Sequence, residues 1–478
     1  MNISIIICYI IIILELLSAV WCLYRAIKYK IFHIANKENE NIKTDKEDSN
    51  IIIVIPCLRE QDIIIQTIKH FLEITNDFNT VKLLIVTTQK EEYERKKSLY
   101  LEKQFIEDIK NNIDIHKLIS KYNKLLSTNE IKDILSDRNK ENIEDIIHKR
   151  ISYSKSTNEV VREFINKNHL EKQVYLFHYP NNEGIMADQL NYVLNNFNFI
   201  DEEKYYFSVY NADSIPSKET IKDIIDTINK NNYPKVIQQY SVPLSNWNEL
   251  SNLMKGFAIY QANFELRYGL INSHFPNKFL YTYVVGHGMY VRVDILKKIG
   301  GFETKYWCED IYMSYVLRNE VIPIYSIGSL EMMQSPQYLS ILTKQNAVWF
   351  KTSFECLKIF RDVYKKNKKL NFSSLGWLIQ RIRMNLTWLF LPVVFGLTVI
   401  ISILNKNIYT LVISILTYLV MILLEYGSII KIIENLEKFK FKNKIKLLYG
   451  TILAVSISNI GPLYSLISRK KEKYKTVR

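Results

Sequence analysis

The chain has 478 residues, of which 48% are hydrophobic, and its formal net charge is +14. A chain of this length and apolar content can bury one or two substantial cores, which excludes a disordered protein and a disulfide-stabilised small domain. Its five cysteines form no C-x-x-C pair, so we expect reduced thiols. The basic excess would suit nucleic acid, but the apolar residues are concentrated in particular segments, which favours a membrane as the acidic partner.

The N-terminal segment is expected to be a membrane anchor. Residues 3–24 are apolar except for Glu15 and a few small polar groups, long enough for a helix that crosses about 30 Å of hydrocarbon. We therefore predict a transmembrane anchor over residues 1–30, with a cleaved signal peptide as the alternative. Basic residues follow this run directly, so the N-terminus should lie outside and the rest of the chain in the cytoplasm. Residues 31–50 are predicted to be a polar linker.

The C-terminal region, residues 384–467, contains further candidate spans, followed by a basic tail at 468–478. Two apolar runs at 384–404 and 409–429 are separated by a short polar break, and a third covers 447–467. If all three crossed, the basic tail would end outside, against the positive-inside tendency. The third run contains Gly461-Pro462 and several serines, so we expect two simple spans and a re-entrant or interfacial segment. Glu425 lies within an apolar run and has no assigned role.

The region between the anchors, residues 51–353, predicts an α/β domain. Continuous β-branched or aromatic runs at 51–55, 81–86, 173–177 and 205–209 predict strands, with helical patterns between them. This alternation favours a mixed, mostly parallel sheet, whose ligands bind beyond the carboxyl ends of the strands. Residues 90–172 form a highly charged helical insertion, which is either a solvated excursion or a partner-binding or capping element; we favour the first.

Several acidic and aromatic residues are candidates for chemistry, each with a structural alternative. Asp213 follows a predicted strand and could hold a divalent cation, or it could cap a helix that begins near Pro216. Glu309 and Asp310 open a helix, where acids suit the helix dipole, or one of them removes a proton from a hydroxyl. Trp349 is either ordinary core or a platform for a sugar ring.

In their order along the chain, these residues resemble the motifs of membrane-anchored family 2 glycosyltransferases, over about residues 51–352. The similar segments are Ile55-Pro56-Cys57-Leu58-Arg59-Glu60 for the family's first strand and Pro-x-x-Asn-Glu turn, residues 181–191 for Gly-Lys-x-x-x-x-Leu-Asn, Asn211-Ala212-Asp213 for Asp-x-Asp, Glu309-Asp310 for Thr-Glu-Asp, and residues 345–349 for Gln-x-x-Arg-Trp.

The resemblance implies a nucleotide-sugar-binding fold of the GT-A type and an inverting displacement, as in processive polysaccharide synthases. Asp310 would be the general base, and Asp213 would hold Mg²⁺ or Mn²⁺ against the diphosphate. Because Asn211 replaces the first acid of the metal motif, His287 is expected as a further metal ligand. The residues expected to contact substrates are Pro56, Glu60, Thr88, Gly184, Asp188, Asn191, Asn211, Glu309, Gln345 and Trp349.

Departures from the family pattern bear on donor and product. Arg59 replaces the usual Asn, Thr87-Thr88 stand where an Asp often touches uracil, and Ile185 replaces a Lys. These changes leave the donor open, with a UDP-sugar as the expectation. Val348 replaces the Arg before Trp349, which argues against long-chain processive synthesis.

Residues 354–383 are predicted to form amphipathic interfacial helices. Apolar side chains at 354, 357, 360 and 364 alternate with Lys and Arg on other faces, as in helices that lie on anionic headgroups. A solvated surface helix is the alternative. Interfacial binding would account for much of the basic excess without nucleic acid.

The expected function is therefore a membrane glycosyltransferase. It would move a sugar, with inversion, from a nucleotide-sugar donor to a hydroxyl of a polysaccharide or lipid-linked acceptor, for a cell-surface polysaccharide or glycolipid. We expect a multi-pass protein of a bacterial plasma membrane, with the catalytic domain in the cytoplasm, membrane lipids as partners and no nucleic acid. The alternative is a catalytically degenerate glycosyltransferase-like membrane subunit that binds or scaffolds.

Overall fold

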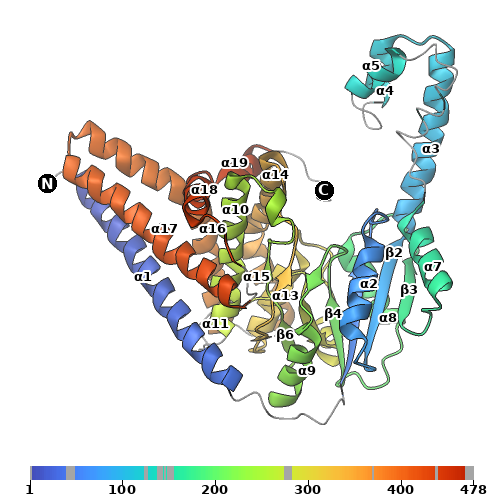
Figure 1. Cartoon of the computed structure of the whole chain (residues 1–478), viewed down its shortest axis with the longest axis horizontal. Helices are drawn as coiled ribbons and strands as arrows, with labels where there is room; N and C mark the ends of the chain where they lie inside the picture. The colour runs from blue at the N-terminus through green and yellow to red at the C-terminus, as the bar shows by residue number, and fades with distance from the viewer. Residues whose placement is uncertain are drawn as a thin grey trace. The chain divides into compact units, whose positions relative to one another are not determined.

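The computed structural model describes residues 3–38, 49–122, 128–136, 144, 147, 155–273, 282–368, 371–436 and 440–468 (Figure 1). The chain divides into two compact units. Unit 1 comprises Met1–Ile53, Glu73–Val81 and Asn198–Arg478, and unit 2 comprises Val54–Leu72 and Lys82–Phe197.

A seven-stranded mixed sheet has the order β3-β2-β1-β4-β8-β6-β9. Its strands are β1 (Asn50–Pro56), β2 (Val81–Thr88), β3 (Val174–Tyr179), β4 (Tyr205–Val209), β6 (Val236–Gln238), β8 (Met289–Arg292) and β9 (Tyr325–Ser326). The pairs β2–β3 and β6–β9 are parallel, whereas β8 is antiparallel to both β4 and β6. The residues of β1 from Ile51 to Ile55 are fully buried, as expected for β-branched side chains in a central strand. The predicted α/β class with a mixed, mostly parallel sheet is confirmed.

Amphipathic helices accompany these strands. They are α2 (Ile64–Thr75), α7 (Thr157–Asn168) and α8 (Met186–Asn196) in unit 2, and α9 (Thr220–Lys230), α12 (Val293–Ile299) and α13 (Glu309–Asn319) in unit 1. In α9, buried Ile221, Ile224, Ile225 and Ile228 recur at the spacing of one helix face.

The described part of the predicted insertion is helical and has a core of its own. It contains α3 (Gln89–Lys110), α4 (Ile115–Tyr122) and α5 (Thr128–Ser136). Its buried residues are Phe105, Ile109, Leu118, Tyr122, Ile131, Ile134 and Ile147. The highly charged segment therefore forms a small packed element.

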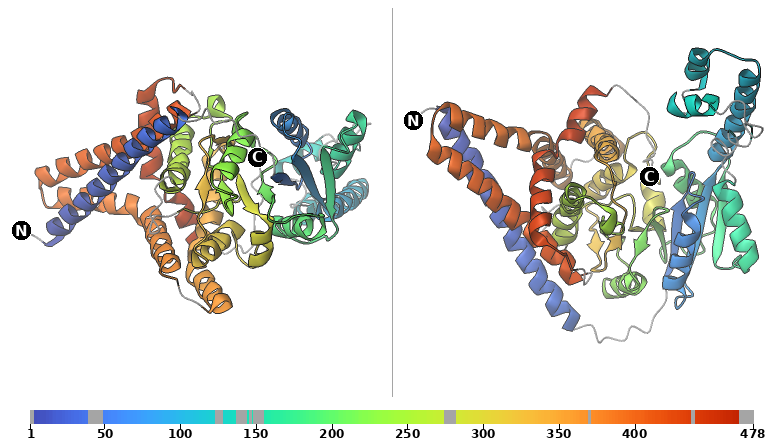
Figure 2. Two further views of the ribbon diagram at one scale, coloured as in Figure 1. Left: turned by 90° about the horizontal axis from the view of Figure 1, so that it is seen from below. Right: turned by 45° about the horizontal axis from the view of Figure 1, so that its top comes forward.

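Three helical segments of the described chain are long and apolar enough to cross a membrane: α16 (Phe372–Leu404), α17 (Ile408–Leu436) and the segment Lys444–Ile467. Because α16 begins at Phe372, the second half of the predicted interfacial region forms the first turns of the same helix as the following span. The N-terminal helix α1 (Ile3–Glu38) continues into the predicted linker and lies along α17 (Figure 2). Residues 39–48 of that linker and the basic tail from 469 lie outside the described residues.

The third segment is broken into α18 (Lys444–Ser456) and α19 (Ile460–Ile467). At 1.5 Å per residue, α18 is about 20 Å long, shorter than the hydrocarbon core of a bilayer. Helix α16 satisfies polar groups at the break: Trp388 Nε1 donates to the Ser458 carbonyl oxygen at 3.0 Å, and Asn459 Nδ2 donates to the Leu389 carbonyl oxygen at 3.1 Å. The break agrees with the re-entrant or interfacial expectation, which stays a prediction.

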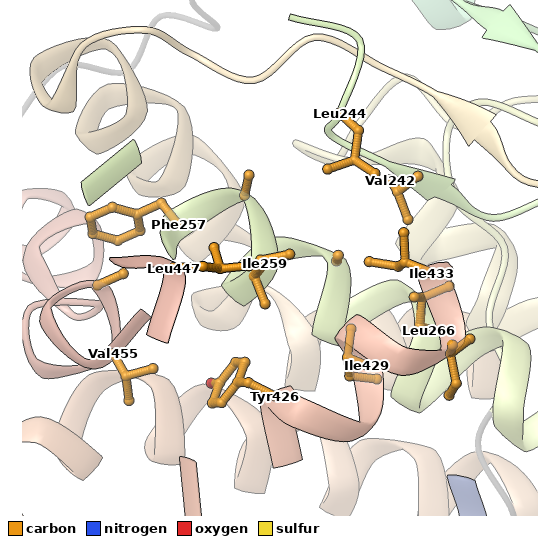
Figure 3. Close-up of a cluster of buried hydrophobic side chains, with 14 of the residues drawn as sticks. Val242, Leu244, Phe257, Ile259, Leu266, Tyr426, Ile429, Ile433, Leu447 and Val455 are labelled. Atoms are coloured by element: carbon orange, nitrogen blue, oxygen red, sulfur yellow. The ribbon is translucent and has the colours of Figure 1, made fainter. Parts of the chain in front are cut away.

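A large apolar cluster of unit 1 joins α10 (Asn252–Glu265) to the candidate membrane helices. At the closest approach of α10 and α18, a Cβ atom on Gly256 would lie 2.1 Å from the Gly450 carbonyl oxygen. Such backbone contact requires glycine on both helices. Around it, Phe257 of α10 shares one core with Leu447 of α18 and Tyr426 of α17 (Figure 3).

Unit 1 also contains several short elements. They are β5 (Ile215–Pro216), β7 (Ser241–Val242), the 3₁₀ turn Trp247–Glu249, the π-helical turn Leu266–Leu270, α11 (Ile271–Ser273), β10 (Glu331–Met332), α14 (Leu339–Lys351), the 3₁₀ turn Thr352–Phe354 and α15 (Cys356–Asn367).

Candidate active site

Strand register brings three segments of unit 1 to one edge of the sheet. Val209, the last residue of β4, pairs with Met289, the first residue of antiparallel β8, and Gln238 at the end of β6 pairs with the same residue. The loop after β4, the segment before β8 and the residues after β6 therefore meet. Gly288 N donates to the Val209 carbonyl oxygen at 2.8 Å, and Gln239 N donates to the Gly288 carbonyl oxygen at 2.7 Å.

Gly288 makes this close approach possible. Its φ is +64°, in the left-handed region, and a Cβ atom there would lie 2.5 Å from the Gln239 carbonyl oxygen. Only glycine adopts this conformation without a side-chain clash. His287 is thereby held at the edge where the Asp213 loop begins.

A second, three-stranded sheet with the order β5-β10-β7 supplies an acid that the sequence did not indicate. Within it, Glu331 of β10 pairs with Pro216 and Ser241. His287 Nδ1 lies 2.9 Å from Glu331 Oε2, and only 1% of Glu331 is exposed. Burial lowers the pKa of His287, but the charge and hydrogen bond of Glu331, with smaller contributions from Glu265 and Asp213, raise it to about 10. At neutral pH this ring is an imidazolium.

Glu265, the last residue of α10, is a second acid that sequence reasoning missed. Its Oε2 accepts hydrogen bonds from Ser241 N at 2.6 Å and from Ser241 Oγ at 2.9 Å. Burial raises the pKa of Glu265, and the charge of His287 opposes that rise. The edge thus contains a histidine cation among several carboxyl groups.

Asp310 opens α13 beside this cluster. Its Oδ2 accepts from Gly286 N at 3.0 Å and its Oδ1 accepts from Ile311 N at 2.7 Å, so both oxygens are fixed by backbone donors. Burial raises the pKa of Asp310, while these two donors and the charges of Arg381 and His287 lower it. Glu309 is buried, and a Cβ atom on Gly286 would lie 3.3 Å from Glu309 Oε1.

The predicted base and metal residues of unit 1 are therefore within electrostatic range of one histidine. The charge of Asp213 acts on His287, and the charge of His287 acts on Asp310. Asn211 N donates to Ser214 Oγ at 3.0 Å and shapes the turn that holds Asp213. The alternative in which Asp213 caps the next helix is wrong, because that helix begins at Thr220 with Glu219 as its N-cap.

Gln345 and Trp349 lie on α14, which packs against α19. A Cβ atom on Gly461 would lie 2.4 Å from Asn346 Cβ, so this helix is fixed against the broken membrane segment. Gln345 Oε1 is buried and, within the described part of the chain, accepts no hydrogen bond. Trp349 is half-buried, and the choice between a sugar platform and ordinary core stays a prediction.

The predicted nucleotide-binding residues lie in unit 2, where several of them complete local structure. Pro56 ends β1, and Glu60 N donates to Thr157 Oγ1 at 2.9 Å. Thr88 is buried and caps α3, because its Oγ1 accepts from Lys90 N at 3.0 Å. Thr88 therefore has a structural role as a helix cap.

The segment before α8 is also shaped by helix capping. Asp188 Oδ2 accepts from Ile185 N at 2.7 Å. Gly184 has φ +132°, and a Cβ atom there would lie 3.0 Å from Tyr179 Cε1, so the turn favours glycine. Asn191 follows on the same helix.

The side chains at this edge could hold a cation only if a substrate supplied further ligands. No three His, Cys, Asp or Glu side chains of the described chain form a metal-binding group. His287 would have to lose a proton and its pairing with Glu331 before it could ligate a metal. Asp213 remains, and a single carboxylate suits Mg²⁺, which protein sites commonly bind with one or two carboxylates and substrate phosphates. The metal roles of Asp213 and His287 stay predictions.

Similarity to known proteins is limited to solved structures, since neither a family model nor a curated protein matches the sequence. The mannosyltransferase PcManGT from Pyrobaculum calidifontis, in complex with GDP-Man and Mn²⁺, aligns over 96% of this chain and 100% of its own, with 10% identity and a TM-score of 0.45. TarS residues 1–349 from S. aureus align over 86% of this chain and 90% of their own, with 10% identity and a TM-score of 0.38. At these values the similarity extends to neither substrate nor mechanism.

Proposed function

We propose that the chain is a membrane-bound glycosyltransferase that moves a sugar, with inversion, from a nucleotide-sugar donor to a hydroxyl of a polysaccharide or lipid-linked acceptor. One observation carries this proposal: Asp213, His287 and Asp310 interact electrostatically at a single edge of the sheet. Ligand sites in α/β folds form at the carboxyl ends of strands, as here after β4 and β6.

Asp310 acts as the general base on the acceptor hydroxyl. Two backbone N–H groups hold its carboxylate in one orientation, and burial raises its pKa, which makes it a stronger proton acceptor. General-base assistance of this kind contributes about 10²- to 10⁴-fold. The rate should therefore rise with pH through the pKa of Asp310, because the carboxylate must be ionised to accept the proton.

The leaving diphosphate needs positive charge. Asp213, with Asn211 beside it, would hold Mg²⁺ or Mn²⁺, which neutralises the diphosphate when bound. His287, kept protonated by Glu331, adds a fixed positive charge at the same edge. This role excludes that of a metal ligand for as long as the proton remains.

The two substrates are bound by different residues. Nucleotide binding is assigned to residues of unit 2, namely Pro56, Glu60, Thr88, Gly184, Asp188 and Asn191. Acceptor binding is assigned to Glu309, Gln345 and Trp349, with Trp349 stacking on the sugar. The donor in this proposal is a UDP-sugar.

A location at the membrane surface is supported by α15. It buries Cys356, Ile359 and Val363 against the protein, yet Leu357 is 65% exposed and Tyr364 45% exposed. The exposed Lys and Arg side chains of the helix flank this second apolar face, as in helices that lie on anionic headgroups. Interfacial binding is the better of the two sequence alternatives.

The test uses the full chain in lipid nanodiscs with a panel of labelled UDP- and GDP-sugars and Mg²⁺ or Mn²⁺. We expect Asp310→Asn to abolish transfer and to leave nucleotide binding nearly intact, while Glu320→Gln, at the exposed end of the same helix, changes neither. Unchanged turnover in Asp310→Asn would reject the assigned base. A wild-type chain that neither transfers sugar nor binds nucleotide would favour the alternative, a catalytically degenerate subunit that binds or scaffolds.

A further inference from the structure

Helices α13 and α16 run antiparallel, in a register that places an arginine level with Asp310. Asn371 Nδ2, at the start of α16, donates to the carbonyl oxygen of Asn319 at the end of α13, at 3.4 Å. Farther along, the rings of Trp377 and Tyr315 lie 6.1 Å apart. One more turn forward on α16 gives Arg381, and one turn back on α13 gives Ile311, next to Asp310.

Arg381 is a cation without an acidic partner within ion-pair distance in the described part of the chain. Its guanidinium lies 5.8 Å from the ring centroid of Trp377, which is fully buried. Its Nε is buried and, among the described residues, donates to no acceptor. Leaving a buried donor unsatisfied costs free energy, which an anion bound here would recover. Its charge reaches Asp310, Tyr283 and Tyr315.

A second arginine on the same helix provides the contrast. Arg383 is exposed, and its Nε donates to Gln380 Oε1 at 3.1 Å, within its own helix. Arg383 therefore serves as a matched control of equal charge, two residues away on the same helix.

We propose that Arg381 binds a phosphate group of a substrate beside Asp310. A guanidinium presents a planar set of donors that matches two phosphate oxygens. The inference rests on the proposed function, since it names the group that a substrate places next to the base. Two sources share this chemistry: the diphosphate of a nucleotide-sugar donor and the phosphate of a lipid-linked acceptor, because α16 continues directly into a candidate membrane span.

Phosphate binding here would also assist the base. The charge of Arg381 lowers the pKa of Asp310 in the free protein. A bound phosphate offsets that charge, so the carboxylate becomes more basic when the substrate is in place. Arg381 is then a substrate-binding residue whose charge also affects the basicity of Asp310.

The experiment measures binding of inorganic pyrophosphate by calorimetry to the full chain in phosphatidylcholine nanodiscs. We expect Arg381→Gln to weaken binding by about tenfold or more, the loss typical of one hydrogen bond to a charged group. Arg381→Lys should recover part of that loss, and Arg383→Gln should bind as the wild type does. If Arg381→Gln does not fold, Arg381→Met, which keeps an apolar stem over Trp377, replaces it: lost binding supports the proposal and retained binding overturns it.

Two further arms distinguish the sources. Equal weakening of UDP and GDP in Arg381→Gln assigns the donor diphosphate. Direct binding of phosphatidic acid that weakens in Arg381→Gln, while UDP and GDP bind as in the wild type, assigns the acceptor phosphate. Wild-type affinity of folded Arg381→Gln for pyrophosphate, both nucleotides and phosphatidic acid would overturn the inference. Sugar transfer is not part of these measurements, so a failure of the proposed function is recognised separately, through Asp310→Asn.

Discussion

The predicted site residues of unit 1 and unit 2 have different local environments. In unit 2, Thr88 and Asp188 accept hydrogen bonds that close the first turns of helices. In unit 1, His287 and Asp310 have pKa values raised by charge or by burial. Perturbed ionisation is a mark of functional sites, whereas a cap is a requirement of folding. In the proposed function the chemistry belongs to unit 1 and the nucleotide contacts belong to unit 2.

The largest expected effect on stability comes from breaking the buried ion pair between His287 and Glu331. Glu331→Gln leaves the His287 ring buried without its counter-charge, which should cost about 3–5 kcal/mol of the free energy of unfolding. Thermal melting of the full chain in nanodiscs measures the loss. Glu320→Gln, an exposed acid, should melt as the wild type does, and a wild-type melting temperature for Glu331→Gln would contradict the ion pair.

The pH dependence of melting checks the same pair. Because the pKa of His287 rises from 6.5 to about 10 on folding, its contribution to stability is complete below pH 6.5 and is lost as pH rises through about 10. In Glu331→Gln the main cause of that rise is gone, so this alkaline loss should disappear.

A smaller effect is expected from the cap in unit 2. Thr88→Ala removes the acceptor for Lys90 N and should destabilise the chain by about 1 kcal/mol, while Thr88→Ser keeps it. Melting of both variants, with transfer measured alongside, sharpens the comparison. A loss of donor affinity in Thr88→Ala at unchanged stability would show that Thr88 contacts the nucleotide instead.

The smallest effect is expected at the turn after β1. Arg59 adopts φ 60°, its backbone N donates to Glu91 Oε2 at 2.9 Å, and its side chain pairs with Glu94. This pair is partly exposed, so Glu94→Gln should change stability by less than about 1 kcal/mol. A larger loss in the melting experiment would mean that Glu94, rather than buried Glu91, maintains the turn.

The sequence predicted those elements whose signal is local. The β-branched run at 51–55 became β1, and the aromatic run at 205–209 became β4 with the same bounds. The turn that carries Asp213 and the helix that begins with Glu309 were likewise found from strand ends and a helix start. Periodicity and turn residues are sufficient where the cause lies within a few positions.

The rest depends on contacts between distant residues. β6 has three residues and β8 four, too few for a period, and their antiparallel register brings His287 to the strand ends. Glu331 reaches His287 through a two-residue strand, and Glu265 lies at the C-terminal end of α10. Arg381 is level with Asp310 only through the packing of two helices. No local sequence pattern predicts such contacts between distant residues.

The backbone contact at Gly256 and Gly450 limits how the chain can be shortened. A fragment that stops before residue 372 would lack α18, and Phe257 would lose the hydrophobic partner it has in Leu447. Water would then contact the apolar face of α10, which is buried in the full chain. Such a truncated chain should therefore precipitate rather than stay in solution. Helix α10 and the candidate membrane helices therefore have to fold together.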